Sequence, residues 1–218
     1  IHATCLSFVA ALDTASSLIA TGRYQKILVV SSDIASCGLN FAEPESATLL
    51  GDAAAAAVLV RTPEDEPSQV HNALMRTFSE GAYYTAISGG GARRHPHNRE
   101  PRPEDNLFHM DGPAVLRLVR RTSPDYLEAL RPGLSRRLPG IDVVVPHQAS
   151  KIGLMMLERF GWPEERVIRT IEKLGNCVSA SIPATLYEGV RAGRIQRGDT
   201  VLLIGTGAGL SIGGLILT

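Results

Sequence analysis

Three side chains of this chain could carry covalent chemistry: Cys5, His147 and Asn176. Cys5 opens a predicted helix, where free N–H groups and aligned peptide dipoles favour a thiolate and predict a lowered pKa. Seen alone, each residue also fits a structural role: a packed thiol, a histidine that ends a strand, or a helix N-cap. Together, a helix-start Cys with His and Asn elsewhere in the chain form a recognised nucleophile arrangement.

The surrounding sequence predicts where the other two side chains lie. His147 follows the apolar run 143–145, so it is expected at the carboxyl end of a buried strand, where open α/β sheets place their ligands. Asn176 stands between Gly175 and Cys177 at a predicted helix start. The three side chains are therefore expected at element ends, where a site can form.

An internal repeat relates Cys5 to Asn176. Each stands seventeen residues before a Gly-Arg pair, Gly22-Arg23 or Gly193-Arg194, and an apolar strand follows each pair. Both units are typical of loop, helix, glycine stop and strand. The spacing predicts two similar halves, with Cys5 and Asn176 in equivalent places, although chance similarity of two helix–strand units is the alternative.

The periodicity predicts alternating helices and strands. Helices are expected over residues 6–21, 112–138 with an interruption near Ser123-Pro124, 151–160 and after Asn176. Strands are expected over residues 26–33, 53–60, 70–78, 141–145, 167–171, 201–204 and 211–217, and a polar loop over 81–107.

Composition excludes several classes of protein. The 218 residues are 44% hydrophobic and 20% charged, which is typical of a soluble α/β protein with a sizeable core. The formal net charge of zero does not favour nucleic-acid binding, and no apolar run is long enough to span a membrane. Three widely spaced cysteines favour a reducing compartment. His95, His97 and His109 lack companion ligands, so no metal site is predicted.

The motifs around these residues resemble the thiolase superfamily, and within it the 3-oxoacyl-acyl-carrier-protein synthase III branch of condensing enzymes. The matching segments run in family order from residue 4 to the C-terminus: Thr4-Cys5-Leu6-Ser7-Phe8, Gly51-Asp52 with its alanine run, Met110-Asp111-Gly112, Val145-Pro146-His147-Gln148-Ala149, Gly175-Asn176 and Gly207-Ala208-Gly209. The resemblance covers the whole chain but only about the last two-thirds of such an enzyme.

The resemblance implies a duplicated five-layer α-β-α-β-α fold whose N-terminal part is missing from this chain. Residues 1–64 would be the remainder of the N-terminal half, and residues 65–218 the C-terminal half with His147 and Asn176. The missing segment is expected from a longer protein or from another chain.

The resemblance also implies roles for individual residues. Cys5 would take an acyl group from a thioester, with the oxyanion held by the backbone N–H groups of Cys5 and Gly209, where a side chain would block approach. His147 and Asn176 would hold the enolate formed when a malonyl thioester loses CO₂, giving a 3-oxoacyl product. Val115, Leu116 and Ser150 are assigned to substrate binding, although the first two also fit ordinary core. No metal or redox cofactor is required, because coenzyme A or carrier-protein thioesters are the substrates.

Alternatives are left open by the same residues. Relatives with this triad join two acyl thioesters without decarboxylation, or transfer acyl groups to hydroxyls in natural-product and polyketide pathways. A non-catalytic partner subunit or an incomplete fragment is the competing class, and a papain-like hydrolase fits the repeat poorly. The resemblance further implies fatty acid biosynthesis, a cytoplasmic homodimer and a possible acyl carrier protein as partner.

Overall fold

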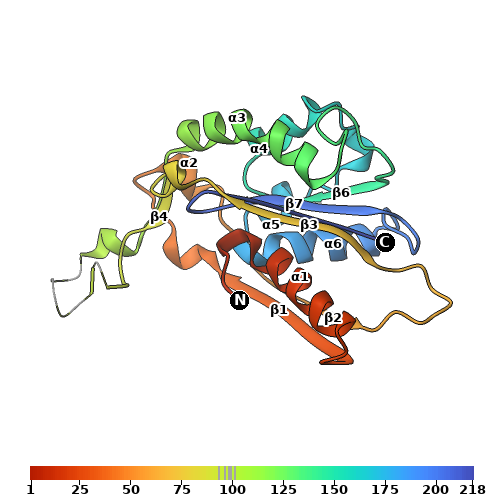
Figure 1. The fold of residues 1–218 in the computed structure, drawn as a ribbon. Coiled ribbons are helices and arrows are strands. Elements are labelled where there is room, and N and C mark those ends of the chain that lie inside the picture. The colour runs from red at the N-terminus through yellow and green to blue at the C-terminus, as the bar shows by residue number, and fades with distance from the viewer. Residues whose placement is uncertain (93, 96, 98–99, 101) are drawn as a thin grey trace.

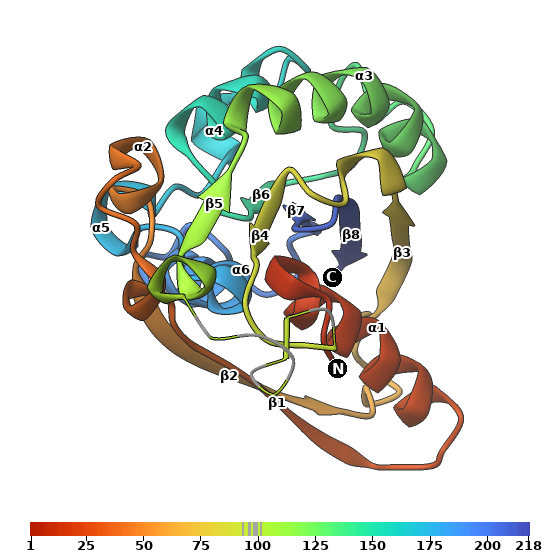
Figure 2. The same cartoon turned by 90° about the vertical axis from the view of Figure 1, so that its left-hand side faces the viewer.

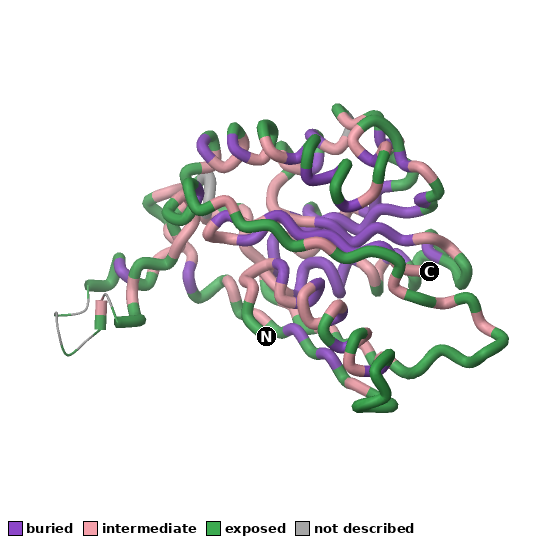
Figure 3. Tube along the Cα trace, viewed as in Figure 1, coloured by how far each residue is buried: buried purple, intermediate pink, exposed green. Residues whose placement is uncertain are grey.

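A four-stranded sheet forms the centre of the fold in the computed structural model, which describes residues 1–92, 94–95, 97, 100 and 102–218. Its strand order is β3-β8-β7-β6, with β6 parallel to β7 and both other pairs antiparallel. The strands are β3 (Val70–Thr77), β6 (Val143–Pro146), β7 (Val201–Gly207) and β8 (Ser211–Leu217). β6, β7 and β8 are almost continuously apolar and buried, as expected of strands covered on both faces (Figure 3).

A second sheet contains β1 (Lys26–Ile34) and β2 (Asp52–Val60), paired antiparallel over their whole length. Figure 2 shows this ribbon well separated from the central sheet, with helices between them. Side chains alternate between the two faces of each strand, and apolar residues occur on both faces. The inner face meets the core, whereas the outer face is exposed in the described part of the chain.

Helices separate the layers (Figure 1). Both α1 (Ser7–Ala20) and α6 (Ser181–Arg191) contact the two sheets and so lie between them. In α1, buried side chains recur with helical spacing at Phe8, Leu12, Ala15 and Ile19. The helices α3 (Gly112–Leu130) and α4 (Lys151–Glu158) cover the other face of the central sheet. The described residues therefore form four of the five expected layers.

Short elements complete the described chain. They are α2 (Pro44–Ala47), α5 (Ile171–Leu174) and the small hairpin of β4 (Thr85–Ile87) with β5 (Phe108–Met110). The boundary expected at residues 64 and 65 falls in the segment between β2 and β3, whose strands belong to different sheets. None of the helices in the described ranges combines the length and apolar character needed to cross a bilayer.

The internal repeat is present, but its register differs from the sequence prediction. Gly22 and Gly193 match, because each has a positive φ. In both places the next residue, an arginine, donates its backbone N–H to the carbonyl of the residue five positions before that arginine. At the other end, two 3₁₀ turns match: Thr4–Leu6, here called the Cys5 turn, and Val178–Ala180, here called the Ser179 turn.

Two details fix this register. The first residue of each turn has the left-handed φ that β-branched residues rarely adopt, 50° at Thr4 and 48° at Val178. The serine that opens each following helix accepts a backbone N–H bond from four residues earlier. Cys5 therefore corresponds to Ser179 and not to Asn176. Asn176 lies three residues before Ser179, and α1, with 14 residues, is three residues longer than α6, with 11. These two differences cancel, so Cys5 and Asn176 have equal spacings from their glycine pairs.

Two expected elements also differ. The predicted strand 167–171 is reduced to a single parallel bridge between Val144 and Val167, since α5 begins at Ile171. The predicted break near Ser123-Pro124 does not occur, and α3 continues through Pro124. The buried face of α3 outweighs the loss of one helical hydrogen bond at the proline.

Candidate active site

The Cys5 turn is held by local hydrogen bonds in front of α1. The hydroxyl of Ser7 donates to the Thr4 carbonyl at 2.6 Å and accepts the Ala3 N–H at 3.0 Å. A left-handed φ at Thr4 costs on the order of 1–3 kcal/mol, so such a turn persists only when its surroundings support it. The strained residue directly precedes the candidate nucleophile.

Glycines on β7 let this turn and His147 approach the same strand. A Cβ added at Gly207 would lie 2.6 Å from Thr4 Oγ1. A Cβ added at Gly205 would lie 2.5 Å from His147 Cβ and 3.4 Å from Leu6 Cδ2. Because alternate residues of a strand share one face, the Cys5 turn and His147 meet on one face of β7.

His147 directly follows β6, at the carboxyl end where the sequence predicted it. Its backbone N–H donates to the Ile204 carbonyl of the neighbouring strand at 2.7 Å. Burial lowers the pKa of His147 to about 4, so the ring is neutral at physiological pH. Its Nδ1 atom is buried without a partner among the described residues. We assign the proton to Nε2, because the other tautomer would bury an unpaired N–H donor at Nδ1.

Asn176 is anchored through its backbone and oriented through its side chain. Its N–H donates to the Leu49 carbonyl at 2.6 Å, and its carbonyl accepts the Gly51 N–H at 3.0 Å. Its Oδ1 accepts the N–H of Val178 at 3.0 Å. Since the oxygen side of the amide is used, the Nδ2 side is the one left to donate.

These elements come together around β7. The Ser179 turn, which follows Asn176, contacts the Cys5 turn and also β1, while the Cys5 turn contacts β7 beside His147. Segments from the start of the chain, from the end of β6 and from just before α6 are thus brought next to one another. All three predicted residues lie at element ends, and their action as one catalytic site stays a prediction.

The ionisation of Cys5 differs from the sequence prediction. Burial raises the pKa of the Cys5 thiol to about 12, although its own N–H and that of Ala208 lower the pKa. The carboxylate of Asp33 adds to the rise. Desolvation outweighs the favourable peptide dipoles, because a buried thiolate loses its hydration. Cys5 is therefore a neutral thiol in this structure.

The backbone donor beside Cys5 also differs from the expected one. The N–H that faces the Cys5 thiol belongs to Ala208, whereas the predicted oxyanion donor was Gly209. A side chain at Gly209 would not be blocked by the described protein atoms, since an added Cβ meets nothing within 4 Å. Its φ of +99° is what requires glycine there. The residue type of Ala208 gives no sign that its N–H is the donor. The only signal in the sequence is its place in the glycine-rich turn.

The residues assigned to substrate binding occupy two helices. Ser150 is the N-cap of α4, and its hydroxyl accepts the Gly153 N–H at 3.0 Å. Val115 and Leu116 are partly buried on α3. A substrate role for the three residues stays a prediction.

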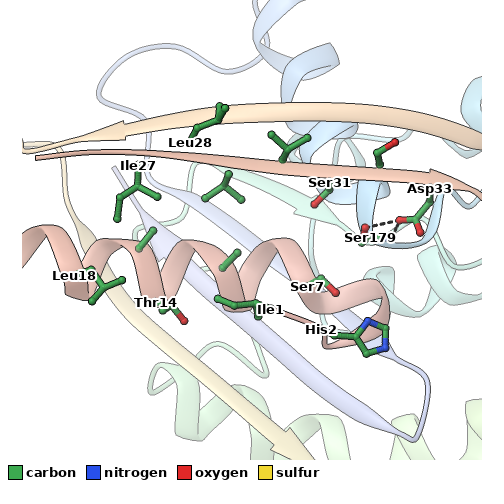
Figure 4. A pocket seen from close by; sticks show the side chains of 15 residues that line it. Ile1, His2, Ser7, Thr14, Leu18, Ile27, Leu28, Ser31, Asp33 and Ser179 are labelled. Atoms are coloured by element: carbon green, nitrogen blue, oxygen red, sulfur yellow. Dashed lines mark hydrogen bonds between the residues drawn. The ribbon is translucent and has the colours of Figure 1, made fainter. Parts of the chain in front are cut away.

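Two cavities in the described part of the chain are not lined by the three site residues. A cavity of about 480 Å³ lies between α1 and β1 and reaches Asp33 and Ser179 (Figure 4). A larger hollow of about 1210 Å³ lies between the end of α1, β2 and β3. Neither is lined by Cys5, His147 or Asn176.

The histidines considered as metal ligands do not form a cluster. His109 bonds Glu43, and the rings of His95 and His97 stack on each other, while Pro96 between them lies outside the described residues. Across the described ranges, no three His, Cys, Asp or Glu side chains are grouped to hold a metal ion.

Two family models match the chain. The model of 3-oxoacyl-(acyl-carrier-protein) synthase III matches residues 1–78, and the model of the C-terminal part of the same enzyme family matches residues 137–218. The first match contains Cys5, and the second contains His147 and Asn176.

Individual relatives agree with these matches. A beta-ketoacyl-(acyl-carrier-protein) synthase III of Koribacter versatilis is 28% identical over the whole chain, which spans 66% of that relative. The solved 3-oxoacyl-(acyl carrier protein) synthase III of Pseudomonas aeruginosa is 28% identical with a TM-score of 0.83, and the chain covers 65% of it. The corresponding Thermus thermophilus structure is 33% identical over 99% of this chain and 66% of its own, with a TM-score of 0.82. The chain thus spans about two-thirds of the length of the proteins it matches.

Proposed function

Because the chain belongs to the 3-oxoacyl-acyl-carrier-protein synthase III family of thiolase-fold condensing enzymes, we propose that it carries the reacting residues of an acyl-thioester condensing enzyme. The observation that carries the proposal is that the Cys5 turn and His147 meet on β7, while the Ser179 turn, which follows Asn176, contacts the Cys5 turn. The substrates are an acyl thioester, such as an acyl-coenzyme A, and a malonyl thioester.

In the first step, the Cys5 sulfur attacks the thioester carbonyl. The acyl group is transferred to Cys5, and the proton of the thiol leaves with the departing thiol. The N–H groups of Cys5 and Ala208 lie beside the sulfur and are suited to stabilise the oxyanion that develops. We name Ala208 in place of Gly209 as the second donor.

In the second step, a malonyl thioester loses CO₂ and its enolate carbon attacks the acyl carbonyl on Cys5. The bond between the acyl carbon and the Cys5 sulfur breaks, the 3-oxoacyl thioester is released, and the departing Cys5 thiolate takes up a proton from solvent. The enolate oxygen accepts hydrogen bonds from His147 Nε2–H and from the Asn176 amide. Neutral donors suit this task, since both can stabilise the developing charge without being protonated themselves. The chemistry calls for no metal or redox cofactor, because the thioester supplies the activated carbonyl.

The first test is acylation of Cys5. Incubation of the protein with an acyl-coenzyme A is expected to add one acyl mass to the peptide that contains Cys5, as measured by mass spectrometry. The rate of acylation is expected to rise with pH, because the thiolate is the attacking form and burial raises the pKa of Cys5 to about 12. An adduct confined to Cys37 or Cys177, or no adduct, would contradict the nucleophile assignment.

The second test separates the two steps. His147→Ala and Asn176→Ala are expected to leave acylation possible and to depress condensation with a malonyl thioester, by about 10²- to 10³-fold for the loss of one such donor. Equal loss of both steps would contradict the division of roles. Offering a second acyl thioester or an alcohol in place of the malonyl thioester tests non-decarboxylative condensation and transfer to a hydroxyl.

Partners follow from the same proposal. An acyl carrier protein would deliver the malonyl group, and a second copy of the protein would complete a homodimer. The exposed Arg117 and Arg120 on α3 offer positive charge to an acidic carrier.

A further inference from the structure

One carboxylate joins β1 to the Ser179 turn next to the site. Asp33, close to the end of β1, accepts two hydrogen bonds through Oδ2 from Ser179, a residue 146 positions later in the chain. The backbone N–H of Ser179 lies 3.0 Å from Oδ2, and the Ser179 hydroxyl donates to the same oxygen (Figure 4). A charged acceptor makes both bonds stronger than neutral ones. Asp33 thus fixes the Ser179 turn to β1.

The Ser179 turn in turn orients Asn176. The residue before Ser179 is Val178, whose N–H donates to Asn176 Oδ1 at 3.0 Å. Val178 adopts a φ of 48°, which is unfavourable for a β-branched residue and requires support from the surrounding structure. Two consecutive N–H groups of one turn therefore point to two different acceptors, Asn176 Oδ1 and Asp33 Oδ2.

We propose that Asp33 is a positioning residue for Asn176: by holding the Ser179 turn, it keeps the Val178 N–H on Asn176 Oδ1 and leaves the Nδ2 hydrogens for the substrate. The inference rests on the proposed function, because Asn176 matters as a donor in the second step. It assigns a role to a residue outside the Cys-His-Asn motif.

The surroundings of Asp33 support this role. The Ser179 turn contacts both β1 and the Cys5 turn, so a displacement of the turn would be felt inside the site. Burial is the main cause of the raised pKa of both the Cys5 and the Cys177 thiol, and the charge of Asp33 adds to the rise at both. The carboxylate lies close to the reacting groups while bonding to neither Cys5 nor Asn176 directly.

The central test replaces Asp33 and follows the two chemical steps separately. In Asp33→Ala, the Cys5 acyl adduct is expected to form at least as fast as in the wild type, because Asn176 takes no part in that step and loss of the Asp33 charge removes one cause of the raised Cys5 pKa. Condensation is expected to fall about 10- to 100-fold, as for a misplaced reacting group. Asp33→Asn keeps the shape and one neutral acceptor oxygen, so it is expected to lose less. If Asp33→Ala does not fold, Asp33→Asn provides the same comparison.

A double-mutant cycle shows whether Asp33 acts through Asn176. In an Asn176→Ala background, adding Asp33→Ala is expected to change condensation by about twofold or less, since the residue that Asp33 positions is already gone. Independent losses that multiply would overturn the proposal. Asp142→Ala is the matched control, because Asp142 also accepts a backbone N–H, that of Thr200 at 2.9 Å, but next to the start of β6, away from His147.

Hydrogen exchange separates this inference from the proposed function. In Asp33→Ala, the amides of Val178 and Ser179 are expected to exchange faster than in the wild type and in Asp142→Ala. Unchanged exchange at both amides would overturn the inference even if condensation falls. If the wild type takes no acyl group at all, the proposed function fails, and the exchange experiment still decides whether Asp33 holds the turn.

Discussion

At the level of single residues, the neutral ring of His147 links the stability of the fold to pH. Burial lowers its pKa from 6.5 to about 4. Below about pH 6.5 the unfolded chain binds a proton that the folded protein does not bind until about pH 4, so the folded state loses stability across this interval. The stability that the neutral ring contributes is fully present above the unfolded pKa of 6.5 and is lost as the pH falls to about 4. A pKa shift of this size corresponds to about 3 kcal/mol of unfolding free energy.

The measurement compares the wild type with His147→Asn. Urea unfolding at about pH 7 and about pH 4.5 is expected to show a larger loss of unfolding free energy in the wild type, because the variant has no ring to protonate. The carboxylates of the protein contribute equally to the pH dependence of both proteins, so their effect cancels in the difference. The same loss in both proteins would show that His147 does not titrate as described.

Residue types and short motifs were sufficient to propose Cys5, His147 and Asn176 as the reacting residues. They were not sufficient for Ala208, Asp33 or Ser179, whose importance comes from contacts made across the chain. The bond between Asp33 and Ser179 spans 146 residues, and no local pattern reports such a pairing. The thiolate expected at Cys5 was wrong for a related reason, since burial is a property of the folded site and not of the helix start.

At the level of elements, Gly51 allows the segment before β2 to pair with the segment around Asn176. A Cβ added at Gly51 would lie 2.0 Å from the Leu174 carbonyl oxygen, which is far inside contact distance. Gly51→Ala is therefore expected to push the two backbones apart and to break the bond from the Gly51 N–H to Asn176. The free energy of unfolding is expected to fall by about 3 kcal/mol, the upper end of the usual range for overpacking.

Gly22→Ala provides the comparison for this prediction. An added Cβ at Gly22 meets no atom within 4 Å, and only its φ of +74° opposes alanine. This variant is expected to lose about 1 kcal/mol and to keep full condensation activity. Urea unfolding and the two-step assay measure both variants. Equal losses of stability, or normal condensation in Gly51→Ala, would contradict the account.

Sequence periodicity predicted most elements but not their registers. Strands such as β1 and β2 were predicted within a residue, because their limits are marked by turns and a change of composition. The equivalence of Cys5 with Asn176 was wrong, because spacing from the glycine caps cannot reveal that the two helices differ in length. Likewise, burial of one face of α3 allowed the helix to continue through Pro124, and this depends on the packing of the folded protein.

At the level of the whole molecule, the outer face of β1 and β2 is a continuous apolar surface. Leu28 lies opposite Val58, and Val30 lies two pairs further along on the same face. Each of these three residues is 59–62% exposed. Monomeric proteins rarely expose such a surface, and paired strands with open edges also associate readily. The 218-residue chain produced alone is therefore expected to self-associate in a concentration-dependent way.

Sedimentation velocity tests this expectation. Val30→Lys combined with Val58→Lys is expected to reduce association, because the charges disrupt the apolar surface. Met155→Lys is the matched control, since Met155 is 56% exposed on α4 at the other side of the molecule. Association that is equal in all three proteins, or absent in the wild type, would contradict the prediction.

The unequal lengths of α1 and α6 have a consequence for how the two halves came to differ. Measured from the matching glycine caps, the three additional residues of α1 extend it by about 4.5 Å, close to one turn. The same position of the repeat thus carries a reactive thiol at the tip of the longer helix and an anchoring hydroxyl at the tip of the shorter one. Gain or loss of a single helical turn is thus a minimal change that gives one half of a duplicated fold the attacking thiol and the other half the hydroxyl that anchors the turn.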